Sequence, residues 1–175
     1  MRPTRPISRI PLLFALFLNL AFTAQGETAS RSNGIAEMQW FSGQWSCDGK
    51  FTRSGKSISA DLSFESTLDN KWMLFRHEDR PPYSYHALSE WGWDEKGQQY
   101  VSIVEDSTGG VRLFYSRGFS GSRLVWDGKA LGNSADPAER FEFRKDGANA
   151  FTVGYSYEQN GQWQDVDSSS CLRKP

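Results

Sequence analysis

The sequence predicts an all-β fold, an antiparallel up-and-down barrel of about ten strands preceded by a short N-terminal helical turn. Polar and apolar residues alternate with a period of two along many short segments, for example along residues 151–157. Turn-forming pairs such as Asp146-Gly147 and Asn160-Gly161 separate these segments, because tight hairpin turns require residues that adopt positive φ at low cost. Aromatic residues make up 14% of the chain although mean hydropathy is only -0.61, as expected for strands with one packed face and one wet face.

The first 26 residues have the features of an export signal. Three arginines precede the apolar run 11–24, and the small residues of Ala24-Gln25-Gly26 suit a signal peptidase. The apolar run is shorter than the roughly 18 to 20 residues that a membrane-spanning helix needs. We therefore expect residues 1–26 to be removed on export, with an uncleaved anchor as the alternative. The mature protein is then expected to be periplasmic or secreted and to have no membrane span.

Residues 27–39 are expected to form a flexible lead-in that ends in a short helix, ahead of a barrel domain at 40–175. Residues 27–36 are mostly small and polar, whereas Ile35, Met38 and Phe41 are spaced so that they share one face of a helix at 34–41. A helix at this position often closes one end of a barrel of this kind. One or two helical turns are expected here.

Ten strands are expected between the turn signals. Glycine-containing or Asp-Asn turns separate most of them, and Pro81-Pro82 and residues 132–138 make longer connections. The expected strands are 43–53, 57–68, 71–79, 83–94, 98–106, 111–117, 122–131, 139–145, 150–158 and 162–171. A meander of this length leaves two open edges unless it closes on itself, so a closed barrel is favoured.

Cys47 and Cys171 are the two cysteines of the chain, and they fall on the first and last expected strands. In an exported protein such a pair favours a disulfide bond, with two separate free thiols as the alternative. The bond would enclose roughly 125 residues and stabilise the fold by about 4 to 5 kcal/mol in the chain-entropy model. If these cysteines face each other in an antiparallel pair, Trp45 lies opposite Arg173.

The segment Gly43-Gln44-Trp45 resembles the Gly-x-Trp motif of the lipocalin (calycin) β-barrels, which carry small molecules. In lipocalins an arginine from the end of the barrel stacks on this tryptophan. The resemblance thus implies a barrel-closing contact between Trp45 and Arg173, and a frayed terminal arginine is the alternative. Further segments resemble a bacterial exported family of lipocalin-like barrels with no assigned function, which implies the fold alone. These segments are 68–75, 91–94, 99–101 and 106–110.

No catalytic, metal or cofactor site is expected. His77 and His86 have no clear third ligand, and no serine is set in a Gly-x-Ser-x-Gly turn. Haem barrels of the nitrobindin type use a histidine near the C-terminus, whereas both histidines here lie in the middle of the chain. The face of the last strand that carries Cys171 also carries Asp165 and Asp167. Either a bulge resets that face, or part of the interior is polar.

The candidate ligand-binding residues are Arg76, Tyr85, Trp91, Arg112 and Tyr155. Rings on one strand face with a few polar groups are typical of a small-molecule cavity, and ten strands enclose more space than eight. An arginine among rings suits an acidic or phenolic ligand. The inward face of strand 71–79 stays open, because residues 72–75 are apolar on both faces.

The expected function is binding of a small apolar or amphipathic molecule by an exported barrel, without catalysis. Net charge is -1 with basic and acidic residues interspersed, so no nucleic-acid partner is expected. The alternative is a protein-interaction or inhibitor barrel of the cell envelope, with residues 27–40, Pro81-Pro82 and 132–138 as its contact surface. A third possibility is an enzyme acting on a small molecule inside the cavity.

Overall fold

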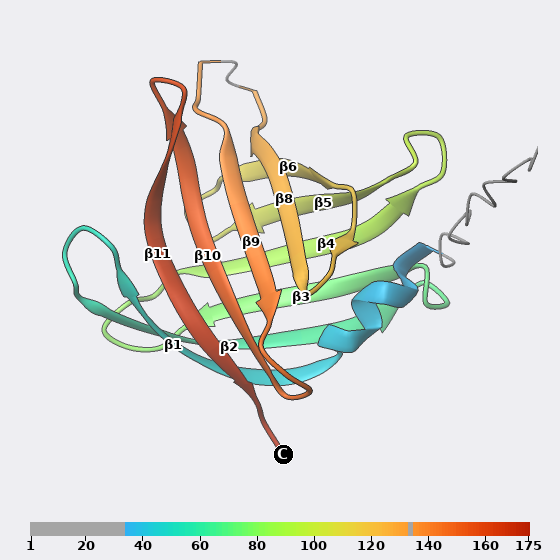
Figure 1. Cartoon of the computed structure of the whole chain (residues 1–175), viewed down its shortest axis with the longest axis horizontal. Coiled ribbons are helices and arrows are strands. Elements are labelled where there is room, and N and C mark those ends of the chain that lie inside the picture. Colours follow the sequence, from blue (N-terminus) through green and yellow to red (C-terminus); the bar gives the residue numbers. More distant parts are fainter. Residues whose placement is uncertain (1–33, 133–134) are drawn as a thin grey trace, which may run out of the picture. The chain divides into compact units, whose positions relative to one another are not determined.

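Strands make up most of the chain in the computed structural model, which describes residues 34–132 and 135–175 (Figure 1). A 3-10 helix, η1 (Gly34–Phe41), precedes eleven strands: β1 (Gly43–Phe51), β2 (Ser57–Thr67), β3 (Trp72–Asp79), β4 (His86–Asp94), β5 (Gln99–Asp106), β6 (Val111–Ser116), β7 (Phe119–Ser120), β8 (Arg123–Ala130), β9 (Glu139–Lys145), β10 (Ala150–Gln159) and β11 (Gln162–Arg173). The expected signal peptide and residues 27–33 of the lead-in lie outside the described residues. Within the described ranges, no helix is both long enough and apolar enough to cross a bilayer.

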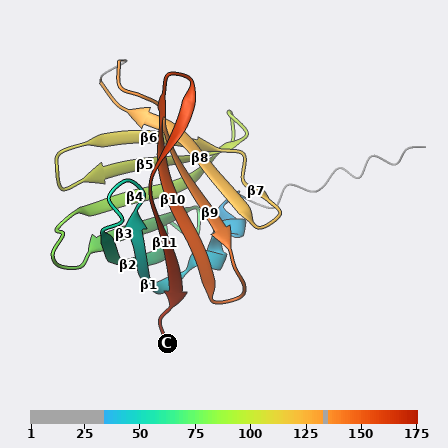
Figure 2. The same cartoon turned by 60° about the vertical axis from the view of Figure 1, so that its left-hand side comes forward.

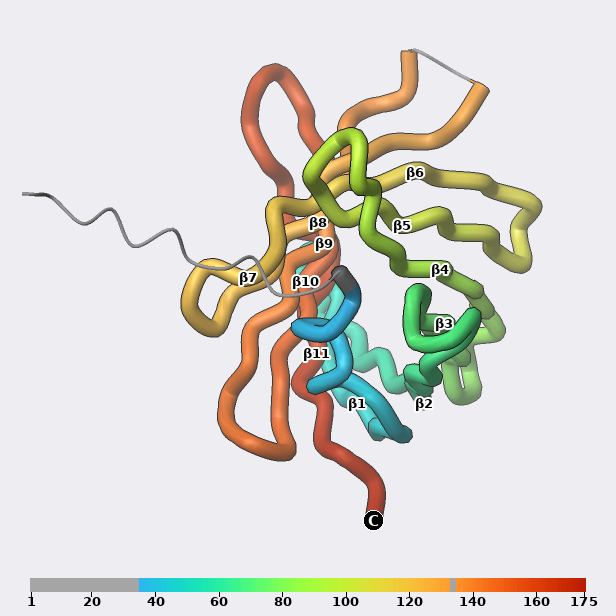
Figure 3. The backbone as a smooth tube through the Cα atoms, turned by 90° about the vertical axis from the view of Figure 1, so that its right-hand side faces the viewer, coloured from blue at the N-terminus to red at the C-terminus, as the bar shows by residue number. Residues whose placement is uncertain are grey.

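Ten of the strands close into an antiparallel barrel, which confirms the predicted fold class. Neighbours along the chain are neighbours in the sheet from β1 to β6 and from β8 to β11. β1 pairs with β11 and β6 pairs with β8, and these two ladders complete the ring. The short β7 pairs only with β8. In Figure 3 the strands surround η1, which lies at one end of the ring.

The observed strands follow the predicted ranges closely, with two differences. The fourth strand begins at His86 rather than at residue 83, because residues 80–85 form the β3–β4 loop and the Asp79 N–H donates to the Tyr85 carbonyl at 2.9 Å. Pro81 and Pro82 carry no N–H for a strand ladder. The second difference is β7, which has two residues and is therefore too short to show an alternating pattern in the sequence.

The pairing of β1 with β11 has the register that the two cysteines predict. Cys47 and Cys171 form a disulfide bond, and Trp45 lies opposite Arg173. The Arg173 guanidinium lies 4.1 Å from the centroid of the Trp45 ring. Gly43 has a φ of 111°, and a Cβ atom there would lie 3.2 Å from Arg173 Nη1. The glycine of the Gly-x-Trp segment therefore makes room for the arginine that closes the barrel.

The second closing ladder, between β6 and β8, also depends on a glycine. It spans only Arg112–Tyr115 against Asp127–Ala130. A Cβ atom on Gly128 would lie 2.1 Å from the Leu113 carbonyl oxygen. Since no side chain tolerates such a distance, any other residue at position 128 would push the two strands apart.

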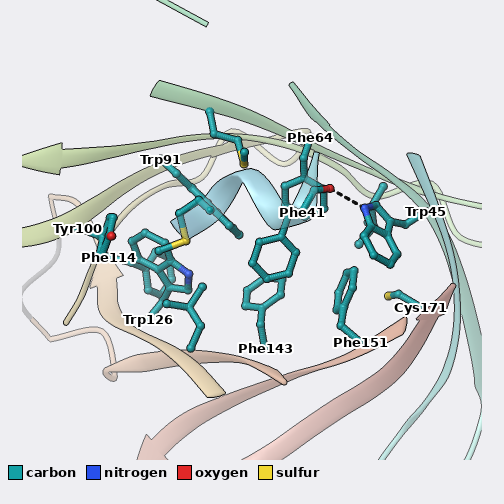
Figure 4. Close-up of a cluster of buried hydrophobic side chains, with 14 of the residues drawn as sticks. Phe41, Trp45, Phe64, Trp91, Tyr100, Phe114, Trp126, Phe143, Phe151 and Cys171 are labelled. Atoms are coloured by element: carbon teal, nitrogen blue, oxygen red, sulfur yellow. Dashed lines mark hydrogen bonds between the residues drawn. The ribbon is translucent and has the colours of Figure 1, made fainter. Parts of the chain in front are cut away.

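An aromatic core fills the end of the barrel that η1 covers. Ile35, Met38 and Phe41 are 3%, 0% and 0% exposed, and their spacing of three residues matches the three-residue turn of a 3-10 helix. The Trp45 indole Nε1 donates to the Phe41 carbonyl at 2.7 Å (Figure 4). The Phe41 ring lies 5.3 Å from that of Phe151, so the helix is packed into the core rather than resting on it.

A bulge in β11 and a polar part of the interior together account for Asp165 and Asp167. The register between β10 and β11 shifts at Tyr155/Ser156, which leaves Val166 without a partner on β10. Asp165, beyond the bulge, is exposed, whereas Asp167 is half-buried. Both expected explanations therefore apply, because the bulge turns Asp165 outward and the interior is polar at Asp167.

The loops alternate between the two ends of the barrel, as they must in an up-and-down sheet. The end covered by η1 also receives the C-terminus of β11. The opposite end carries the β1–β2, β3–β4, β5–β6 and β10–β11 connections. Figure 2 shows the β10–β11 hairpin projecting from the end opposite the C-terminus. This opposite end is called the mouth below.

Candidate functional site

A cavity of about 710 Å³ lies inside the barrel. Small side chains at inward positions create it, because Ala60, Ala87, Ser89 and Ser102 face the interior where larger residues would fill it. Most of the wall is apolar and comes from Phe51, Ile58, Leu62, Phe75, Trp91, Val104, Phe114, Trp126, Phe141, Phe143 and Val153. The volume is in the range of about 300 to 1,000 Å³ that is usual for small-molecule sites.

Four of the five residues expected to bind a ligand line this cavity. Trp91 is on β4, Arg112 on β6 and Tyr155 on β10, while Tyr85 lies in the β3–β4 loop rather than on β4 itself. They come from separate parts of the ring, and the barrel brings them to one interior.

Arg76 does not reach the cavity. β3 turns Met73, Phe75 and His77 inward and leaves Arg76 exposed on the outer face. The sequence left the inward face of this strand open because its outer face is also apolar. That outer apolar surface has a structural role, since the Trp72 ring covers Gly92. A Cβ atom on Gly92 would lie 2.6 Å from that ring.

Arg112 is held by two carboxylates. It forms a very short ion pair with Asp106, and its Nε lies 3.1 Å from Glu139 Oε2. Burial alone would raise the pKa of Asp106, whose side chain is fully buried, but hydrogen bonds from Thr108 and Arg112 lower it to about 2. Arg112 and Asp106 therefore remain a charged pair at neutral pH.

Two of the tyrosines that line the cavity, Tyr85 and Tyr155, are kept protonated. Burial raises the pKa of Tyr155, and the charge and hydrogen bond of Glu139 raise it further. Burial also raises the pKa of Tyr85, although the nearby Arg112 charge works against it. The Tyr155 ring stacks on Phe141 at 4.9 Å between ring centroids. These tyrosines can therefore serve as neutral donors and flat surfaces, not as bases.

Asp167 is the least compensated charge in the cavity. Burial, together with the charge of Asp79, raises the pKa of Asp167 to about 6. Asp79 itself lies 2.8 Å from His77 Nε2. Within residues 34–132 and 135–175, no cation pairs with Asp167. Alternation had placed Asp167 on the face of Cys171, so its inward position was visible in the sequence, but its lack of a partner was not.

The arrangement of the cavity side chains suits the binding of a small molecule. In the described part of the chain, no three His, Cys, Asp or Glu side chains gather in a group that could hold a metal ion. The cavity instead combines an aromatic wall with several polar side chains near its mouth, among them Tyr85, Asp167 and the arginine cluster. Such a site can bury an apolar body and orient a polar group.

No family model matches the chain, and no curated protein matches it. Among solved structures the chain is similar to a redesigned beta barrel, b11L5F_LGL, with 12% identity, 78% of this chain and 94% of that chain covered, and a TM-score of 0.38. It is also similar to EF1p2_mFAP2b bound to DFHBI, with 12% identity, 79% and 97% covered, and a TM-score of 0.36. A third is mFAP1, a redesigned beta barrel bound to DFHBI, with 14% identity, 78% and 96% covered, and a TM-score of 0.35. At these values the likeness carries no functional argument.

Proposed function

We propose that the protein binds a small apolar or amphipathic molecule inside the barrel and does not catalyse a reaction. The observation that carries this proposal is the cavity itself, which is large enough for such a molecule and lined mainly by aromatic and aliphatic side chains. Transfer of apolar surface from water to this wall would supply the affinity, at about 25 cal/mol per Å² buried. Polar side chains near the mouth would set the orientation of the ligand.

The test is a fluorescence titration with N-phenyl-1-naphthylamine, a neutral apolar dye that becomes bright when it leaves water. We expect saturable binding to the full chain with the Cys47–Cys171 bond intact. Ala87→Trp should abolish it, because Ala87 lines the cavity. Glu90→Trp on the same strand is the matched control, because Glu90 is exposed. Equal binding by both variants, or no saturable binding to the unmodified protein, would refute an interior site.

Export and membership of a lipocalin-like family remain part of the proposal. The disulfide between β1 and β11 suits an oxidising compartment, and an expected signal segment precedes the barrel. The Arg173–Trp45 contact is the one that the lipocalin resemblance implies. N-terminal sequencing of the protein recovered from an exporting host tests the first point, with a new terminus after Gly26 as the expected result.

A protein-binding barrel is the competing function. Its contact surface would include the lead-in, but Ile35 and Met38 are buried in the core, so a deletion that tests this surface should end before Gly34. Deletion of 27–33 should leave dye binding unchanged if the cavity is the functional site. Loss of dye binding would place the site on the lead-in instead.

A further inference from the structure

We propose that the ligand is an amphipathic organic cation, with a protonated amine at Asp167 and an apolar body against Phe141 and Tyr155. This inference rests on the proposed function, because it names the ligand class of the same cavity. It also replaces the acidic or phenolic ligand that the sequence suggested. The charges, the aromatic surface and the unpaired polar groups of the wall each support it.

Carboxylates outnumber lysine and arginine side chains in the cavity wall. Three carboxylates line it, those of Asp79, Glu139 and Asp167. A fourth, that of Asp106, is paired with Arg112. Arg112 is the only lysine or arginine that lines the cavity in the described ranges. Since Arg112 is already bound to two carboxylates, it has no charge left to offer an anionic ligand, and the wall as a whole repels one.

Asp167 is the position where a cation is missing. It is half-buried and close to the Asp79 carboxylate, and no basic side chain in the described residues forms an ion pair with it. A buried carboxylate beside a second one is unfavourable until a positive charge offsets both. His77 lies against Asp79, not against Asp167. A ligand ammonium would supply the absent charge.

The apolar part of such a ligand has a prepared surface next to this carboxylate. Trp126, Phe141, Tyr155 and Asp167 lie side by side on β8, β9, β10 and β11. Phe141 and Tyr155 stack at 4.9 Å, and the Phe114 ring packs against Phe141 at 5.2 Å. A flat or aliphatic group can lie along these rings, and the face of Tyr155 also attracts a neighbouring cation.

A second unpaired polar group lies at the other end of the same row. Trp126 is 2% exposed, and its Nε1 has no hydrogen-bond acceptor in the described part of the chain. Trp126 lines the cavity, and Figure 4 shows its ring nitrogen on the side turned towards the barrel interior. A buried donor without an acceptor is unfavourable, because it has lost its hydrogen bonds to water without replacing them. Trp126 and Asp167 are three strand spacings apart, about 14 Å along the wall.

These two groups independently indicate that the wall is incomplete without a ligand. The Asp167 carboxylate near the mouth has no paired cation, and the Trp126 N–H deeper in the barrel has no acceptor in the described residues. An amine with an oxygen or nitrogen acceptor at its far end meets both requirements. A metal ion does not, because the described residues hold no group of metal ligands.

The experiment compares three molecules with one naphthalene ring and different charges: 2-naphthylmethylamine, 2-naphthylmethanol and 2-naphthoic acid. Each displaces N-phenyl-1-naphthylamine from the full, disulfide-bonded chain at pH 7.5. We expect the amine to bind at least about tenfold more tightly than the alcohol, since hydrogen bonds to charged groups are the stronger ones. The acid should bind more weakly than the alcohol.

Two further measurements locate the effect. Asp167→Asn should weaken amine binding about tenfold and leave alcohol binding within about twofold. Asp165→Asn, at an exposed position of the same strand, is the control. In the unmodified protein the preference for the amine should fall between pH 7.5 and pH 5. Protonation of Asp167 removes the negative charge that holds the ammonium, while Tyr155 stays neutral. Asp79 and His77 are the other titratable groups nearby.

The outcomes separate this inference from the proposed function. If the dye and the alcohol bind but the amine has no advantage, the charge assignment is wrong and the cavity function stands. Preference for the acid would mean that Arg112, and not Asp167, binds the charged group of the ligand, and it would also overturn the inference. If neither the dye nor any naphthalene compound binds, both proposals fail.

Discussion

Replacement of Asp167 by asparagine is expected to stabilise the protein at neutral pH. The pKa of Asp167 rises from its ordinary value of 3.8 to about 6, because the group is buried and faces Asp79. A carboxyl with a raised pKa binds its proton more tightly in the folded chain than in the unfolded chain. Its cost is therefore absent below about pH 4, grows as pH rises, and is complete above about pH 6. At 1.36 kcal/mol per pKa unit the full cost is about 3 kcal/mol.

Urea denaturation at pH 4 and pH 7.5 measures this effect. At pH 7.5 the free energy of unfolding of Asp167→Asn should exceed that of the unmodified protein by up to about 3 kcal/mol, and at pH 4 by less than about 1 kcal/mol. Asp165→Asn should match the unmodified protein at both values, because Asp165 is exposed. A gain of equal size at both pH values, or a loss at pH 7.5, would refute the reasoning.

Three further perturbations test the architecture by urea or thermal unfolding. Joint replacement of Cys47 and Cys171 by alanine should cost up to about 5 kcal/mol, because the bond closes a separation of 124 residues; reduction of the unmodified protein should give a similar loss. Phe41→Ala should cost about 3 to 5 kcal/mol, since the ring is 0% exposed in the aromatic core, whereas Leu68→Ala at a 68% exposed position should cost less than about 0.5 kcal/mol. Arg173→Ala should cost about 1.5 to 3 kcal/mol, because the guanidinium donates to two backbone carbonyls and stacks on an indole ring, and Arg173→Lys should recover only part of this loss. If the unfolding midpoint of any of these three variants is unchanged, the contact that the substitution removes does not stabilise the fold as argued.

The barrel and its first closing ladder could be predicted because local rules and one covalent constraint were sufficient. Turn residues marked the hairpins, and consecutive hairpins left two edges to be joined. The cysteines then fixed the register of the join, and that register placed Trp45 opposite Arg173. The pairing of β6 with β8 was predicted as well, because the expected strands 111–117 and 122–131 are consecutive in the meander and Ser120-Gly121 marks a turn between them. The two-residue β7 that lies between them was not predicted.

The polarity of the cavity could not be predicted in the same way. Arg112 was identified as an inward cation, but its partners Asp106 and Glu139 are 6 and 27 positions away. Only the closed ring brings Arg112 together with Asp106 and Glu139. These two carboxylates change the net charge around Arg112 from positive to negative. Arg76 was misplaced for a different reason, because the outer face of β3 is apolar where Trp72 covers Gly92.

The covalent link between the first and last strands also determines where the barrel opens. In a meander without such a link, the terminal strands are the ones that separate first. Here Cys47–Cys171 turns the ring into a covalently closed loop, so fraying moves to the shortest of the other ladders that make up the ring. That ladder joins Arg112–Tyr115 to Asp127–Ala130, in the middle of the sequence. Backbone amides in β6 and β8 should therefore exchange with solvent sooner than those in β1 and β11.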